Sequence, residues 1–335
     1  MKSSPLLFIL PIFFAGKTFA QTPQENYRKH MIDSIKKVYL REAAIRNPAL
    51  RQVTVSTDLI SRGEIHSKLY GNELYDGKIS QVRTTALLTV PVVKWKKNAI
   101  STSFSFFNQY FDVNNVTFPL YDSIKVNHGY RNKLTVGFTA SYQRVDSLLG
   151  QMVVYTGNLS LLTGDASSIQ KVSFLGGVIF ILKQTPVTNI SVGLFANIDP
   201  SINVPVVPFF IYWHKFKNEV ELSVNLPQQV MLRKALSKNA WFNLGSSLTG
   251  AVAFFQSEQP GIPRNINYSS LDVKSGAGLE FRLSKIVLLG INGGVMTPIM
   301  SRQFELNKRS DDYFISNKIN TTPYGNVTIS LLPFL

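Results

Sequence analysis

The chain has 335 residues, and 35 Lys and Arg against 20 Asp and Glu give it a net charge of +15. This length accommodates two ordinary domains or one large closed β structure. Only 16% of the residues are charged, which argues against a disordered or ribosome-like chain despite the positive charge. The absence of cysteine excludes disulfides, thiolate metal ligands, a thiol nucleophile and the acylated cysteine of a lipoprotein.

The first twenty residues have the pattern of a secretory signal peptide. Lys2 provides a positive n-region, residues 6–15 are apolar, and Thr18-Phe19-Ala20 is a small-x-small cleavage site before Gln21. The apolar core is shorter than the ~20 residues that a membrane-spanning helix needs. We therefore expect export and cleavage of residues 1–20.

Residues 21–49 predict a short helical segment in the periplasm. Apolar residues recur at helical spacing from Tyr27 to Ile45, basic residues lie between them, and Pro48 ends the pattern. A basic amphipathic helix can also lie on a membrane surface or enter a barrel as a plug. These two alternatives stay open beside the periplasmic helix.

The rest of the chain alternates with period two. In residues 133–143 one face carries Leu134, Val136 and Phe138, while the other carries mainly Thr, Ser and Gly, and residues 98–110 behave similarly. A soluble sandwich would pack the apolar face inward, whereas a membrane barrel turns it toward lipid. Because the polar face is small and uncharged, with charges collecting at strand ends and loops, we favour the barrel.

Thirteen strands are expected within residues 50–335. Their ranges are 50–60, 80–93, 98–110, 133–143, 151–163, 170–183, 188–197, 203–215, 219–236, 240–256, 268–284, 286–297 and 323–334, with longer loops at 61–79, 112–130, 257–267 and 298–322. Closed bacterial barrels usually have an even strand number. Either 188–215 is one interrupted strand, giving twelve, or 219–236 breaks at Leu226-Pro227, giving fourteen. We favour an all-β transmembrane antiparallel barrel of about 12 strands, within a range of 10–14.

The small polar face predicts a water-filled lumen. We expect seven residues to line it: Arg83, Ser101, Ser103, Ser105, Thr135, Thr139 and Ser141. Arg83 shares a strand face with Thr85 and Thr89, so it would contribute to a preference for anions.

Three short motifs carry a resemblance to a known group of proteins. Asn47-Pro48-Ala49-Leu50-Arg51 before the first strand, Val90-Pro91 and Leu226-Pro227 resemble the uncharacterised, porin-like outer-membrane β-barrel proteins common in Bacteroidota. This resemblance implies a barrel fold and an outer-membrane location, and carries over no catalytic residues. Asn47-Pro48-Ala49 also resembles the motif in the N-terminal hatch of long-chain fatty-acid transporters, which are fourteen-stranded.

Motifs for catalysis or cofactor binding are absent from the sequence. The four histidines, His30, His66, His128 and His214, show no metal-ligand spacing and match no known catalytic motif, and no phosphate-binding glycine loop is present. We therefore expect no enzyme activity, no metal and no cofactor. Export makes nucleic acid an improbable partner despite the basic composition.

The sequence thus predicts an outer-membrane barrel that is a passive or weakly selective channel for small solutes. Its expected partners are outer-membrane lipid, lipopolysaccharide and, during insertion, the barrel-assembly machinery. The alternatives are a structural or adhesion barrel that does not conduct, and a channel for hydrophobic substrates similar to fatty-acid transporters.

Overall fold

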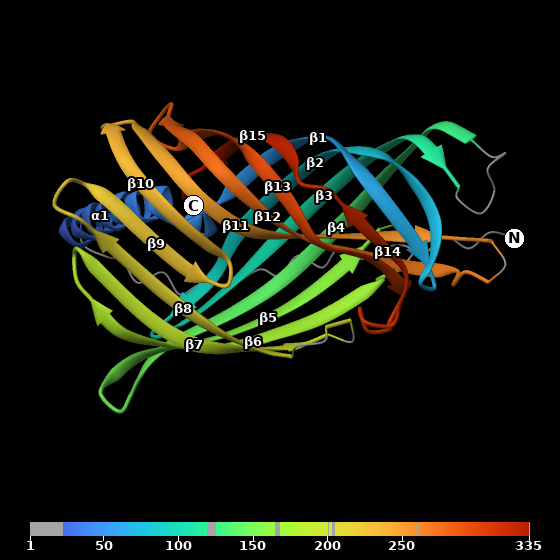
Figure 1. Ribbon diagram of the computed structural model, residues 1–335. Coiled ribbons are helices and arrows are strands. Elements are labelled where there is room, and N and C mark those ends of the chain that lie inside the picture. Colours follow the sequence, from blue (N-terminus) through green and yellow to red (C-terminus); the bar gives the residue numbers. More distant parts are fainter. Residues whose placement is uncertain are drawn as a thin grey trace, which may run out of the picture.

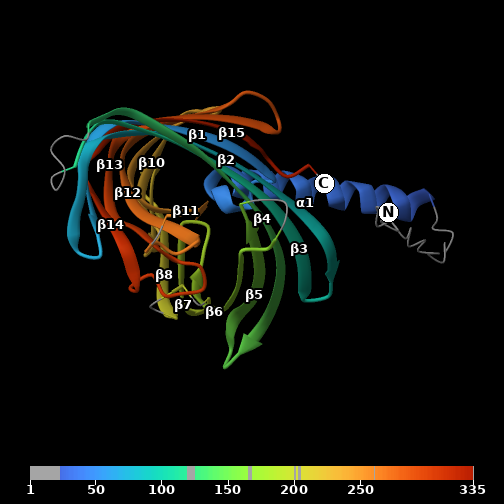
Figure 2. The same cartoon turned by 90° about the vertical axis from the view of Figure 1, so that its right-hand side faces the viewer.

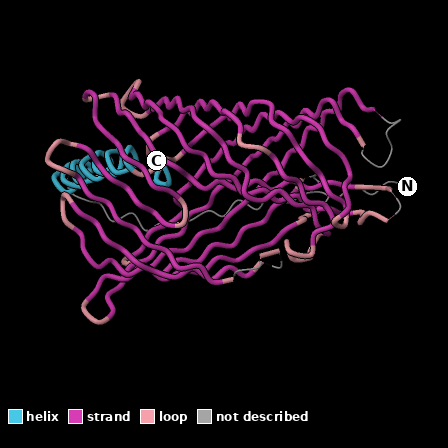
Figure 3. Tube along the Cα trace, in the orientation of Figure 1, coloured by secondary structure: helices cyan, strands magenta, loops and turns pink. Residues whose placement is uncertain are grey.

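A computed structural model describes residues 23–118, 125–164, 168–199, 201–202, 205–259 and 261–334. The expected signal peptide, residues 1–20, lies outside them. Helix α1 (Pro23–Arg46) and a short 3-10 helix, η1 (Pro48–Leu50), precede a chain that is almost entirely strand (Figures 1 and 3). Among the described helices, none is long and apolar enough to cross a membrane.

Fifteen strands form one antiparallel sheet. Their bounds are β1 (Val53–Leu69), β2 (Asn72–Trp95), β3 (Asn98–Thr117), β4 (Lys125–Leu148), β5 (Gln151–Thr163), β6 (Lys171–Gln184), β7 (Thr188–Ile198), β8 (Val206–Lys215), β9 (Val220–Leu226), β10 (Gln229–Ser237), β11 (Ala240–Gln256), β12 (Asn265–Arg282), β13 (Val287–Glu305), β14 (Tyr313–Ile319) and β15 (Thr322–Leu331). Strands β14 and β15 follow one another between β13 and β1, so they share one position in the sheet. Because β1 pairs with them and β12 pairs with β13, the sheet closes into a ring of 14 strands.

The preference for twelve strands is therefore wrong, and the fourteen-strand alternative is the observed one. Residues 188–215 form two separate strands, β7 and β8, and not one interrupted strand. The break at Leu226-Pro227 separates β9 from β10. Proline has no amide hydrogen to donate to a ladder, so it fits the two-residue connection at this hairpin tip.

The expected loops at 61–79, 112–130 and 298–322 are also largely wrong, because strands continue into all three. Strands β1 and β2 remain paired as far as Leu69 and Asn72, and meet in a tight turn in which Tyr70 and Gly71 have positive φ. Beyond the apolar part of the barrel wall the outer strand face becomes polar, and apolar residues such as Ile65 and Ile79 are few and lie on the inner face. The hydrophobic alternation is then too sparse to predict strands, although the backbone ladder continues.

The two ends of the barrel differ. At one end every connection is short, from the turn at 96–97 to the turn at 283–286, and α1 and the C-terminus lie at this same end (Figures 1 and 2). At the other end five of the six connections are longer and that at 70–71 is tight, while the β9–β10 turn at 227–228 lies partway along the barrel (Figure 1). We call these the turn end and the loop end.

The barrel has an apolar outside and a polar inside. On the outside, Phe104 and Leu244 are 50% and 48% exposed, and similar side chains recur around the ring. On the inside, Gln109, Arg83 and Asp272 are 0%, 4% and 1% exposed. This arrangement is the inverse of a soluble sandwich, whose apolar residues pack inward, and it is typical of a barrel surrounded by lipid.

A charge placed on the apolar outside tests this orientation. We expect Phe104→Lys to lower the free energy of unfolding of the protein refolded in phosphatidylcholine liposomes by about 2–4 kcal/mol, because an ammonium would enter hydrocarbon. Urea titration measures the change, and Phe104→Leu is the control, with a smaller loss expected. A neutral or stabilising Phe104→Lys would show that this face contacts water.

Candidate functional site

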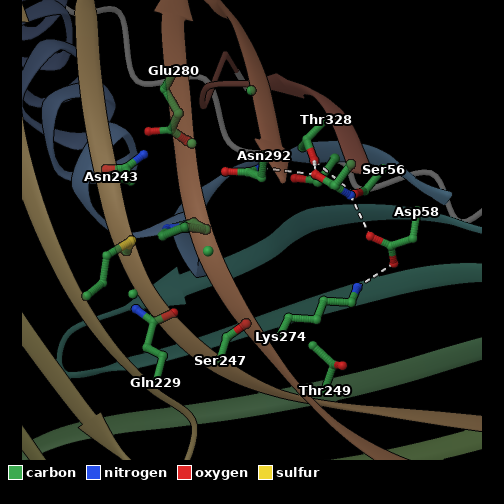
Figure 4. Close-up of a pocket in the computed structure, with 18 of the residues that line it drawn as sticks. Ser56, Asp58, Gln229, Asn243, Ser247, Thr249, Lys274, Glu280, Asn292 and Thr328 are labelled. Carbon is green, nitrogen blue, oxygen red and sulfur yellow. Dashed lines mark hydrogen bonds and ion pairs between the residues drawn. The ribbon is translucent and has the colours of Figure 1, made fainter. Parts of the chain in front are cut away.

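A polar cavity of about 600 Å³ lies inside the barrel (Figure 4). Strands β1, β2, β3, β10, β11, β12, β13 and β15 and the segment after α1 contribute to its wall. Several glycines line it, including Gly276, Gly278 and Gly290. Because these positions carry no side chain, the wall formed by β12 and β13 leaves space that larger residues would fill.

A chain of hydrogen bonds runs along one side of the cavity, centred on Asn326 of β15, and Figure 4 labels its partners Ser56, Asp58, Asn292 and Thr328. Its amide nitrogen donates to Ser56 Oγ and Asp58 Oδ1, both at 2.8 Å. Its amide oxygen accepts from Thr328 at 2.9 Å and from Asn292 at 3.1 Å. Asn326 thereby holds three strands in register and fixes the orientation of the polar groups that face the cavity.

Two buried ion pairs lie at the loop-end side of the cavity. Lys274 donates to Asp58 at 2.5 Å. Arg83 contacts Asp272 at 2.6 Å, and both side chains are almost fully buried. Arg83 also donates from Nε and from Nη2 to Gln81 Oε1. Each buried charge therefore has an opposite charge beside it, as burial in a region of low dielectric requires.

The end of α1 borders the cavity at the turn end. Ala44 and Ile45 are buried against Leu288 and Leu332, with Trp241 packed beside them. Helix C-termini leave carbonyl groups without intrahelical partners. Two guanidinium groups supply donors to these carbonyls, since Arg51 bonds Ala44 O and Arg233 bonds Ile45 O.

One carboxylate forms ion pairs with both arginines at the end of α1. Glu280 contacts Arg51 at 2.6 Å and Arg233 at 3.0 Å. A third cation, Arg46, lies 3.7 Å from Glu221. The helix end is thus attached to the barrel wall by ion pairs and by apolar packing together.

Strand β11 bends across the interior toward the loop end. Its Val252 carbonyl accepts hydrogen bonds from Gln109 of β3 at 3.0 Å and from Thr135 of β4 at 3.1 Å. These strands lie on opposite sides of the ring, and Figure 2 shows the β11 ribbon within the outline of the other strands. Beyond this contact an apolar cluster packs β11 and β12 against β1, β2 and β3: Ile65, Ile79, Phe111, Ala253 and Tyr268.

The charges around the cavity nearly cancel. Five cations line it: Arg46, Arg51, Arg83, Arg233 and Lys274. Each of them is paired with a carboxylate: Asp58 and Glu280 also line the cavity, whereas Asp272 and Glu221 lie outside its lining. The five cations and their four partner carboxylates leave a single positive charge, so the electrostatic potential in the cavity is far weaker than the net charge of the chain suggests.

The residues predicted to line the lumen divide into two groups. Arg83 lines the cavity, and so does Thr85 beside it on the same strand face. The other six, Ser101, Ser103, Ser105, Thr135, Thr139 and Ser141, lie on the faces of β3 and β4 opposite the exposed apolar side chains, but do not line this cavity. Ser103 bonds Thr89, and Thr139 bonds Ser160. A pore lining by these six stays a prediction.

Most of the charged residues of the site, other than Arg83, are not predicted from the sequence. Charges were expected at strand ends and loops, whereas Asp58, Asp272 and Lys274 lie within strands and face the interior. The signal was present, because a charged residue inside a strand of apolar and small residues must face the interior of a barrel. What the sequence does not show is which opposite charge each residue meets across the ring.

Two of the four histidines, His66 and His214, have polar partners in the structure. His66 contacts Asp76 at 2.7 Å on the exposed surface, and His214 bonds Thr188. Within the described parts of the chain, no three His, Asp or Glu side chains gather as metal ligands. The absence of an enzyme activity stays a prediction from sequence.

Breaking the buried Arg83–Asp272 pair tests the description of the cavity. We expect Arg83→Met to lower the free energy of unfolding by about 3–5 kcal/mol, because it leaves Asp272 charged and buried. The double variant Arg83→Met/Asp272→Leu should regain most of this loss, as urea titration in liposomes would measure. Arg309→Met removes the exposed pair with Asp311 and should cost less than about 1 kcal/mol. Equal losses in both single variants would contradict the buried pair.

Solved structures of outer-membrane barrels match the chain weakly. The COG4313 outer membrane channel from Pseudomonas putida F1 has 7% identity and a TM-score of 0.36, covering 84% of this chain and 96% of that one. The transport unit of the autotransporter AIDA-I from Escherichia coli has 8% identity and a TM-score of 0.32, with 84% and 90% covered. A Pseudomonas aeruginosa FadL homologue has 8% identity and a TM-score of 0.28, with 84% and 89% covered. Scores this low carry no argument about function.

Sequence comparison gives the firmer result. No functionally curated protein matches the chain significantly. A family profile described as "Domain of unknown function (DUF6268)" matches residues 150–331, which is more than half of the chain and covers the barrel from β5 to the end of β15. The chain therefore belongs to the DUF6268 family.

Proposed function

We propose that the protein is an integral outer-membrane barrel that acts as a passive, weakly selective channel for small solutes. The observation that carries this proposal is the polar cavity enclosed by a wall with an apolar outside. A barrel that only filled space in a membrane would not need an interior of about 600 Å³ lined by hydroxyl, amide and charged groups. Such an interior suits small polar molecules.

The paired charges support weak selectivity. Arg83 was expected to favour anions, but Asp272 lies 2.6 Å from its guanidinium group and neutralises it. With one excess positive charge around the cavity, neither cations nor anions are strongly excluded. Neutral polar solutes fit this environment best, because the side of the cavity around Asn326 presents both donors and acceptors.

Two elements border the cavity along the barrel axis. The end of α1 lies at the turn end, and β11 crosses the interior toward the loop end. A solute that passes along the barrel has to pass both elements.

The expected cellular setting belongs to the same proposal. A signal peptide at residues 1–20 would direct export, the barrel-assembly machinery would insert the barrel, and lipid and lipopolysaccharide would surround it. The turn end, with α1, would face the periplasm, since periplasmic turns are short in barrels of this kind. The exposed apolar outside supports the membrane location.

Single-channel recording tests the proposal. The refolded protein in a planar bilayer should conduct in a potassium chloride gradient with a reversal potential near zero, because the cavity charges compensate one another. Glu280→Gln should shift the reversal potential toward that of chloride, since Arg51 and Arg233 then lose their shared carboxylate. Asp311→Asn, at an exposed loop position, is the matched control and should change nothing.

Two outcomes would contradict the proposal. A folded, heat-modifiable barrel that never conducts would favour the structural barrel, and deleting residues 21–46 would then show whether α1 is a permanent plug. Equal effects of Glu280→Gln and Asp311→Asn would show that ions do not pass the cavity.

A further inference from the structure

The barrel wall is incomplete between β8 and β11. The two strands between them, β9 and β10, have 7 and 9 residues, whereas β11 has 17. Figure 1 shows the β9–β10 hairpin ending partway along the barrel while β8 and β11 continue toward the loop end. The hairpin therefore fills only the turn-end half of its section of the wall.

The strand pairing defines this gap. The β8–β9 ladder ends at Phe210 and Leu226, and the β10–β11 ladder ends at Gln229 and Ser247. One more hydrogen bond follows, from Leu248 N to Gln228 O. Beyond it, within the described residues, 206–209 pair only with β7, and 249–256 pair only with β12.

Strand β11 is held away from the gap. Its Val252 carbonyl is bound by Gln109 and Thr135 on the far side of the ring. The ring of Phe255 lies 4.7 Å from the Lys133 ammonium of β4. The strand that could pair with β8 thus leans inward, and the gap stays unfilled by backbone.

The gap lies within the apolar part of the wall. Val206 and Phe210 on β8 are 50% and 37% exposed, and Leu226 at the hairpin tip is 46% exposed. Val230, on the other side of the tip, is 43% exposed. Because these side chains belong to the apolar outside, the gap opens toward hydrocarbon and not toward water.

The polar cavity reaches the same place. Gln229, at the hairpin tip, lines it, and so do Ser247 and Thr249, on either side of the point where β11 loses its partner. The cavity thus borders β11 at the point where the β10–β11 ladder ends.

Apolar rings lie beside the gap on the inner side of the wall. Phe209 of β8 is 8% exposed and stacks on Phe195 of β7 at 4.8 Å between ring centroids. Glycines beneath them make room, because a Cβ at Gly177 or Gly193 would collide with these rings. The gap therefore has an apolar margin on both its outer and its inner side.

We infer that this gap is a lateral portal through which single-chain amphiphiles with neutral, hydroxyl-rich head groups pass between the bilayer and the cavity. The head group would bind the donors and acceptors of the cavity, and the apolar chain would lie between Phe209 and the lipid. This inference rests on the proposed channel, and names a class of molecule that the channel admits from the side.

Site-directed fluorescence quenching tests the portal. The chain has no cysteine, so Thr249→Cys, Phe104→Cys and Ser56→Cys each carry one bimane label, and heat-modifiable mobility confirms that each variant folds. The liposomes contain dibrominated phosphatidylcholine, whose acyl chains quench the label on contact. We expect strong quenching at Phe104→Cys on the outside, weak quenching at Ser56→Cys on the far wall of the cavity, and quenching at Thr249→Cys close to that at Phe104→Cys. Quenching at Thr249→Cys as weak as at Ser56→Cys would overturn the portal.

A protection experiment tests the occupant. Decyl glucoside, below the concentration that permeabilises the liposomes, should slow bimane modification of unlabelled Thr249→Cys several-fold and leave Phe104→Cys unchanged. Glucose alone should protect less, because it lacks the chain that occupies the gap. Equal rates at Thr249→Cys with and without decyl glucoside would reject amphiphiles as the occupant. Neither experiment requires conduction, so a failure of the portal and a failure of the proposed channel are distinguishable.

Discussion

The closure of the backbone ladder is the constraint on which the rest of this structure depends. In hydrocarbon, an unpaired amide or carbonyl group costs several kcal/mol, so a sheet in a membrane must close into a ring in which its first and last strands pair. The ring closes because β14 and β15 together complete one strand position between β13 and β1. Closure also creates an interior, and the polar faces of the strands then meet one another across it.

Where a backbone hydrogen bond of the ladder is missing, side-chain hydrogen bonds can take its place. The free part of β11 lacks a strand on one side, and its Val252 carbonyl accepts from Gln109 and Thr135 instead. Strand β11 bends inward at this contact, and among the described residues 206–209 of β8 pair with β7 only. The short hairpin at Leu226 and Gln229 is the local cause of this difference in pairing.

Burial imposes a second rule on the interior, namely that charges occur in pairs. Asp58 with Lys274 and Arg83 with Asp272 follow it, and Glu280 serves two arginines at the helix end. An uncompensated charge at these places would be expensive. Pairing leaves an interior that is polar but nearly neutral, which supports a channel for neutral solutes and weakens the case for anion selectivity.

The sequence by itself determined the class of the fold. Alternation of apolar and small polar residues predicted strands with one lipid-facing and one interior face, and the exposed Phe104 and buried Gln109 follow that pattern. It also placed a helix before the barrel and marked Leu226-Pro227 as a possible break. These are local properties, set by period-two geometry and by the missing amide hydrogen of proline.

Only the tertiary structure decided the strand number, the strand lengths and the site. The regular alternation of apolar and polar residues fades beyond the apolar wall although the strands continue, so the sequence predicts loops there. The ion pairs join residues far apart in the chain, such as Arg83 and Asp272, and no local pattern specifies which charges meet. The gap beside β8 depends on the difference in length between neighbouring strands, a property that exists only once the ring has closed.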